Sequence, residues 1–187
     1  QDGKHSGIFL ETINEILEKS NIQTSNLSGI LFNKGPASFT GTRVAASSLQ
    51  AIGYSLDIPI IGISSLEVMA HMHTIDSNMD KFECAKYAYG DKYFTASFDK
   101  AHKLDQIKDT SLVNIEMINT SHEEHLVINT ELSEYLQNNN LRLTSNHTIL
   151  SRETNSEDLI SFSEKYINLG SKFNLSDTLP DYANHEI

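Results

Sequence analysis

Apolar residues follow helical and extended spacing in turn along the first part of the chain. Over residues 5–20, apolar side chains recur every three or four positions between glutamates and asparagine, which predicts an amphipathic helix. Short apolar runs at 28–33 and 58–62 flank an apolar segment at 42–56, and a third helix is expected from Ser64. This order of strand, helix and strand predicts an α/β unit with a parallel sheet.

The pattern changes after a polar stretch at 74–81. Strands are predicted at 82–89 and 92–98 around a Gly90–Asp91 turn. Further strands are expected at 113–118, 126–128, 141–143 and 148–150, and helices at 130–137 and 156–170. We therefore predict two lobes, each a sheet flanked by helices: residues 1–75 form the N-terminal lobe and residues 76–187 the C-terminal lobe.

Glycines bracket the loop Gly35-Pro36-Ala37-Ser38-Phe39-Thr40-Gly41, and Thr42-Arg43 is predicted to open the next helix. Small residues and proline allow a sharp turn, and a helix N-terminus presents N–H groups and partial positive charge. An anion or a partner carboxylate would fit there, whereas a purely structural turn uses some of the same residues. The candidates for such an anion or nucleotide site are Gly35, Ser38, Thr40, Gly41 and Arg43.

The same loop resembles the G-P-G-S-F-T-G-x-R segment of the bacterial TsaB (YeaZ) family. Three more stretches resemble that family at its own spacing: His5-Ser6, Ile63-Ser64-Ser65-Leu66-Glu67 and Leu179-Pro180-Asp181-Tyr182. Members of the family are non-catalytic partners of the TsaD enzyme in making the threonylcarbamoyladenosine of tRNA. The match is good over the first 70 residues and looser beyond them. The resemblance implies a two-lobed, actin-like (ASKHA, RNase H-like) α/β fold.

Two departures from the family pattern stand out. Family members begin with strands that carry an I-D-T-S-type turn, whereas here a helix follows Gln1-Asp2-Gly3 almost at once. We therefore expect an N-terminal lobe without its first strands, and a natural protein that is longer. The segment Tyr87-Ala88-Tyr89 stands where the family commonly has aspartate, alanine and arginine.

The resemblance implies that helices 5–20 and 42–56 form an interface with TsaD or, in its absence, with a second copy. Packing on the sheet is the alternative for helix 42–56. The resemblance also implies a TsaE-like ATPase as a partner, tRNA contact only through partners, and no cofactor on this chain alone, although ATP could sit at a partner interface. The interface candidates are Phe9, Ile13, Ala45, Ala46, Leu49 and Ile52.

We find no constellation in the sequence that would make a complete active site or metal site. Related TsaD enzymes carry an H-x-x-x-H metal motif, and the aligned positions here are Ser65 and Met69, which are poor ligands for iron or zinc. A catalytically inactive relative is therefore expected. Two enzymatic alternatives stay open: an actin-like ATPase that holds phosphate at the loop beside Arg43, and a glycoprotease-like hydrolase.

Net charge and cysteine content limit the partners and the cellular compartment that we expect for this protein. The 187 residues include 14 Lys+Arg against 25 Asp+Glu, a net charge of −11 that repels phosphate backbones and argues against direct tRNA binding. The single cysteine, Cys84, is expected to be a core residue in a reducing, cytoplasmic environment. No run approaches the ~20 apolar residues of a membrane span, so no membrane contact is expected.

Overall fold

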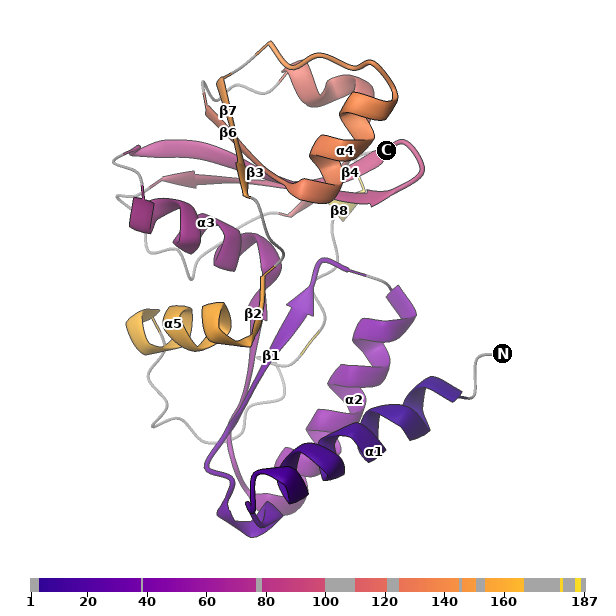
Figure 1. The fold of residues 1–187 in the computed structure, drawn as a ribbon, viewed down its shortest axis with the longest axis vertical. Helices are drawn as coiled ribbons and strands as arrows, with labels where there is room; N and C mark the ends of the chain where they lie inside the picture. Colours follow the sequence, from indigo (N-terminus) through magenta and orange to yellow (C-terminus); the bar gives the residue numbers. More distant parts are fainter. Residues whose placement is uncertain are drawn as a thin grey trace. The chain divides into compact units, whose positions relative to one another are not determined.

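The computed structural model describes residues 4–37, 39–76, 79–99, 110–120, 125–144, 146–150, 154–166, 179 and 184–185. These residues form an α/β protein that divides into two compact units between Ile63 and Ser64 (Figure 1). No helix in this described part of the chain is both long and apolar enough to cross a membrane.

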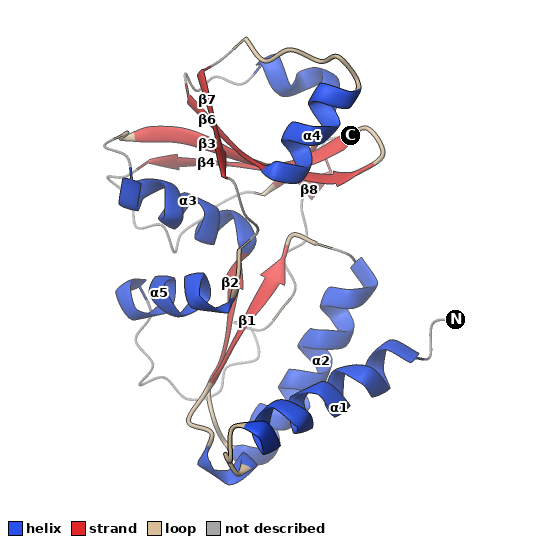
Figure 2. Cartoon of the chain, in the orientation of Figure 1, coloured by secondary structure: helices blue, strands red, loops and turns tan. Residues whose placement is uncertain are grey.

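The described part of the first unit contains two α-helices and two paired strands (Figure 2). Its elements are α1 (Lys4–Lys19), a short 3-10 helix η1 (Thr24–Asn26), β1 (Ile30–Gly35), α2 (Phe39–Leu56) and β2 (Ile60–Ser64). The predicted helix, strand, helix and strand are therefore confirmed in their order. Helix α2 begins at Phe39, before the predicted Thr42, so Thr40 and Gly41 are helical rather than part of the loop.

The core of this unit lies where α1 and α2 pack on the two strands. Its buried members are Phe32, Ala46, Leu49 and Ile60, and partly buried side chains of Phe9, Ile13, Ile30 and Ile52 pack against them. Gly53 lets α2 approach β2, because a Cβ atom at this position would collide with the side chain of Ile60.

The second unit is built on a mixed six-stranded sheet with the order β7-β6-β3-β4-β5-β8. β3 pairs antiparallel with β4 and parallel with β6, and β7 continues the parallel side. The turn between β3 and β4 contains Gly90 with φ 58°, a left-handed conformation that favours glycine. The strands are β3 (Lys81–Tyr89), β4 (Lys92–Asp99), β5 (Ser111–Asn114), β6 (His125–Asn129), β7 (Asn146–Leu150) and β8 (Asn184–His185).

Helices cover both faces of this sheet, α4 (Thr130–Asn138) on one and α3 (Ser65–Asp76) on the other (Figure 2). Successive side chains of a strand point to opposite faces of the sheet, so each face has its own apolar side chains. Ala85 packs in a cluster with Leu132 of α4, while Phe82 meets His73 of α3 in an edge contact at 4.8 Å. α5 (Ser156–Tyr166) packs on α3. These contacts place α3 in the second unit, although the sequence-based boundary near residue 75 assigned it to the first lobe.

Two predicted segments differ from the structure. The strand expected at 113–118 ends at Asn114 and continues as a 3-10 helix, η2 (Ile115–Thr120). The chain turns there because Glu116 N–H donates to Asn114 Oδ1 at 3.0 Å. Residues 141–143 are not a strand. Leu179, in the predicted family-like tail, is 55% exposed, and Tyr182 lies outside the described residues.

Candidate functional site

The glycine-bracketed loop begins as a tight turn at the end of β1. Gly35 has φ 108°, a conformation open to glycine, and its N–H donates to Asn33 Oδ1 at 2.9 Å. Pro36 is buried and Ala37 is exposed. The positive-φ residues other than glycine in the described chain are Asn21, Asp57 and Asn140, so Ala37 fits without strain where the family has a second glycine. This half of the loop forms a tight turn, and the anion site proposed at Gly35 stays a prediction.

The second half of the loop leads into α2 and holds the exposed candidates. Thr40 and Gly41 lie in the first turn of α2, and Arg43 follows; all three are exposed. Backbone N–H groups in the first turn of a helix lack intrahelical partners, so glycine is tolerated there and an anion is favoured. Ser38 lies outside the described residues. Anion binding at this helix start stays a prediction.

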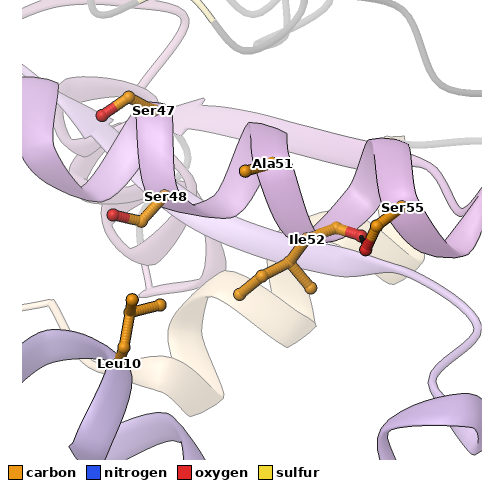
Figure 3. A pocket seen from close by; sticks show the side chains of 6 residues that line it. All are labelled: Leu10, Ser47, Ser48, Ala51, Ile52 and Ser55. Atoms are coloured by element: carbon orange, nitrogen blue, oxygen red, sulfur yellow. Dashed lines mark hydrogen bonds between the residues drawn. The ribbon is translucent and has the colours of Figure 1, made fainter.

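An open groove of about 480 Å³ lies along the contact between α1 and α2. Leu10 of α1 points toward α2, where Ser48 and Ile52 face it (Figure 3). The residues that line the groove are Leu10, Ser47, Ser48, Ala51, Ile52 and Ser55. The hydroxyl of Ser47 donates to Arg43 C=O at 2.8 Å, and that of Ser55 donates to Ile52 C=O at 2.9 Å. These serines therefore present a small surface whose polar atoms are satisfied within the helix.

The structure separates the predicted interface residues into two groups. Ala46 and Leu49 are only 2% and 7% exposed and belong to the core of the first unit. Phe9, Ile13 and Ile52 are partly buried against that core, and Ala45 is also half-buried. The predicted interface on these helices stays a prediction. Ala46 and Leu49 are too buried to contact a partner, whereas the groove residues are accessible. Sequence reasoning missed Ser47, Ala51 and Ser55, although small residues spaced i, i+4 and i+8 indicate a stripe where a helix can approach closely.

Large apolar side chains are exposed on the same two helices. On α1 they are Ile8, Leu10 and Ile16, each at least 44% exposed, and on α2 it is Tyr54, at 77%. Exposed apolar side chains beside a groove are typical of a protein-binding surface. Tyr54 follows Ser47 by seven residues and so lies on the same side of α2. We call the six groove residues together with Tyr54 the α1–α2 face.

The potentially reactive side chains of His71 and Cys84 in the second unit pack in its interior. His71 is buried, lies 3.1 Å from Ser161 Oγ through Nε2, and contacts the ring of Phe162 edge-on. Cys84 is fully buried, and burial, with a smaller contribution from the charge of Glu83, raises the pKa of its thiol well above the usual range. Within the described ranges no three His, Cys, Asp or Glu side chains gather as a metal site would need.

The chain is similar to proteins of tRNA threonylcarbamoyladenosine biosynthesis. A family model described as TsaD, tRNA N6-adenosine threonylcarbamoyltransferase, matches residues 2–86. The protein TsaB of Buchnera aphidicola from Acyrthosiphon pisum is 43% identical over 67 residues, which are 36% of this chain and 30% of that protein. TsaB of Haemophilus influenzae is 39% identical over 66 residues, 35% of this chain and 28% of that protein. The matched segments thus span less than a third of these two relatives.

Similarity to solved structures extends over nearly the whole chain. YeaZ from Pseudomonas aeruginosa superposes with a TM-score of 0.67 at 19% identity, covering 96% of this chain and 85% of that one. A second Pseudomonas aeruginosa structure, described as similar to the peptidase YEAZ, gives 0.67 at 18% identity over 94% and 82%. At these identities the likeness shows that this chain shares the fold of those structures.

Proposed function

We propose that this protein acts in the formation of threonylcarbamoyladenosine in tRNA as a non-catalytic scaffold for a TsaD-type enzyme. The observation that carries the proposal is the α1–α2 face, which lies within the segment matched by the TsaD family model. The relatives most similar in sequence are named as biosynthesis proteins of this modification. Because the matches span only part of those relatives, their activity is extended to this chain as a proposal.

The α1–α2 face fits an apolar partner helix. Ser47, Ala51 and Ser55 leave space for the backbone of a second helix to approach, and the rim supplies the exposed ring of Tyr54. Charge supports the same surface: from Lys19 to Leu56 the sequence contains no Asp or Glu, although the chain as a whole has net charge −11. A docking helix would therefore meet no acidic side chain along α2.

The positions that align with the TsaD metal ligands have a packing role in this chain. Ser65 is the first residue of α3 and is fully buried, and Met69 is 3% exposed in the same helix. A hydroxyl and a thioether are poor ligands for iron or zinc, so these positions support a scaffold rather than a metal-dependent transferase. In this proposal TsaD supplies the chemistry and this chain supplies the surface.

The scaffold proposal extends to the other members of the complex. A TsaE-like ATPase would join the complex of this protein with TsaD, and a homodimer would form through the α1–α2 face when TsaD is absent. The net charge of −11 disfavours a direct contact with tRNA phosphates, so tRNA would bind through the partners. ATP would lie at a partner interface, and the complex would work in the cytoplasm.

The direct test is co-expression with the TsaD of the same organism. Wild type should co-elute with TsaD as a one-to-one complex by size exclusion with light scattering, and should restore modification in cells depleted of the native protein. Ala51→Glu places a charge in the groove and should abolish the complex. Ser25→Glu adds the same charge in the exposed helix η1 and should have no effect. Equal binding by Ala51→Glu would show that the partner uses another surface.

The nucleotide-binding alternative rests on the exposed start of α2. Thr40, Gly41 and Arg43 could contact a phosphate there. Isothermal titration of the isolated protein with ATP distinguishes the two functions. Tight binding with hydrolysis that Arg43→Ala abolishes would favour the ATPase, whereas the scaffold proposal expects neither tight binding nor hydrolysis by this chain alone.

A further inference from the structure

β7 is the terminal strand of the six-stranded sheet. It pairs with β6 along its whole length in an uninterrupted parallel register, from His125 opposite Asn146 to Asn129 opposite Leu150. The strand order places no described strand on its other side. Because each strand carries hydrogen-bonding groups along both edges, the outer edge of β7 has a row of backbone donors and acceptors that no described strand pairs with.

The side chains of residues 146–149 in β7 are exposed. Asn146, His147, Thr148 and Ile149 are all exposed, whereas four of the five residues of β6 are buried. Ile149 is 42% exposed, although isoleucine on a strand usually packs. The helices that cover the middle of the sheet therefore leave both faces of this strand accessible.

Edge strands are usually protected from pairing by lysine, proline, inward charges or bulges. β7 reads Asn-His-Thr-Ile-Leu and has none of these, and its register with β6 is regular. Threonine and isoleucine also favour extended backbone. An unprotected edge of this kind is typical of a strand that accepts a further strand from a partner.

Charge selects the kind of partner. From Tyr135 to Arg152 the sequence contains no Asp or Glu and two of the three arginines of the chain. Arg142, shortly before β7, is exposed, and its backbone carbonyl accepts a hydrogen bond from Asn119 Nδ2 at 2.8 Å, which fixes the chain there. In a protein with net charge −11 this segment is locally basic, and it complements an acidic chain rather than a basic one.

We propose that the outer edge of β7 binds an extended, acidic segment of a partner protein by strand addition. The backbone of that segment pairs with β7, and its carboxylates face the basic segment around Arg142. Every second residue of the segment is apolar and packs beside Ile149. This site lies in the second unit and is independent of the α1–α2 face.

Three fluorescein-labelled peptides test the proposal with the full chain. The first has four Val-Glu repeats, the second has four Val-Lys repeats, and the third is the Val-Glu peptide with its two central valines replaced by proline. Fluorescence anisotropy should show saturable binding of the first peptide only. Hydrogen–deuterium exchange should then slow at residues 146–150. Equal binding of the proline peptide would overturn strand addition, and equal binding of the Val-Lys peptide would overturn the acidic specificity.

Matched variants locate the site. Thr148→Glu places a negative charge on the edge and should weaken binding of the Val-Glu peptide about fivefold, as expected for like charges paired across strands. Thr148→Gln introduces a side chain of the same shape as glutamate but without its charge, and Gln137→Glu adds the charge on α4 instead. Both variants should bind the Val-Glu peptide as tightly as wild type does. An equal loss in Gln137→Glu, or no saturable binding by wild type, would overturn the proposal. A dimer of the protein alone that Thr148→Glu dissolves would assign the edge to a second copy instead.

Discussion

The carboxylate of Glu67 accepts a hydrogen bond from the backbone N–H of Ser64 at 2.9 Å, where β2 leads into α3. Ser64 in turn accepts through Oγ from the N–H of Leu66 at 3.3 Å. All three residues are buried. This reciprocal cap satisfies backbone donors at the start of α3, and it gives a physical reason for the spacing in the family-like segment Ile63-Ser64-Ser65-Leu66-Glu67.

Removing this cap should destabilise the second unit. Glu67→Ala leaves the buried N–H of Ser64 without its acceptor and should lower the free energy of unfolding by about 1–2 kcal/mol. Glu67→Gln keeps an acceptor oxygen and should lose less. Urea denaturation followed by circular dichroism measures both. If the two variants unfold at the same urea concentration as wild type, the cap does not stabilise the helix.

The two sides of α2 should respond differently to substitution. Leu49→Ala removes a side chain from the core of the first unit and should cost about 2–5 kcal/mol. Ala51→Glu changes the exposed groove and should leave stability within about 0.5 kcal/mol. Thermal unfolding compares them. A similar loss in both variants would place Ala51 in the core and remove it from the proposed partner surface.

Gly53 should resist replacement although it lies inside a helix. Alanine is the better helix former by roughly 1 kcal/mol, but its Cβ would collide with Ile60 on β2. Overpacking of this kind usually costs about 1–3 kcal/mol, so Gly53→Ala should be destabilised overall. Ser47→Ala, at an exposed position of the same helix, is the control and should be neutral or slightly stabilised. A stabilised Gly53→Ala would mean that the helix can move away from the sheet.

The buried thiol of Cys84 should make stability depend on alkaline pH. Burial, and secondarily the charge of Glu83, raises the pKa of this thiol in the folded protein above its value in the unfolded chain. Its contribution is therefore fully present below about pH 8.5 and is lost as the pH rises further, because the unfolded chain then releases the proton first. Between about pH 8.5 and 10, wild type should lose more stability than Cys84→Ala in urea titrations. Parallel losses in both proteins would contradict this role of the thiol.

The sequence predicted most elements because their signals are local. The spacing around Phe9 and Ile13 predicted α1, and Ser64 with Glu67 predicted the start of α3. The end of β5 was not predicted because it depends on a turn at Asn114, where the backbone leaves the ladder through a side-chain hydrogen bond. The periodicity of apolar residues does not reveal a side-chain hydrogen bond that competes with strand pairing.

The candidate site was harder to predict than the fold. Helix α2 has alanine, serine and glycine on several sides, so its pattern does not show which side meets β2. The structure places Ala46 and Leu49 on the core side and leaves Ala51 exposed in the groove. Packing against Ile60 decides this orientation, and that contact joins residues that the sequence pattern does not relate. The loop, by contrast, could be predicted in part, since Gly35 meets a local backbone demand.

Association with TsaD tests the central claim most directly. The natural protein and the TsaD of the same organism would be mixed and measured by size exclusion with light scattering, beside Ala51→Glu and Ser25→Glu. A one-to-one complex for wild type and Ser25→Glu, lost in Ala51→Glu, is the predicted result. A folded wild-type protein that elutes alone in the presence of TsaD would contradict the scaffold function.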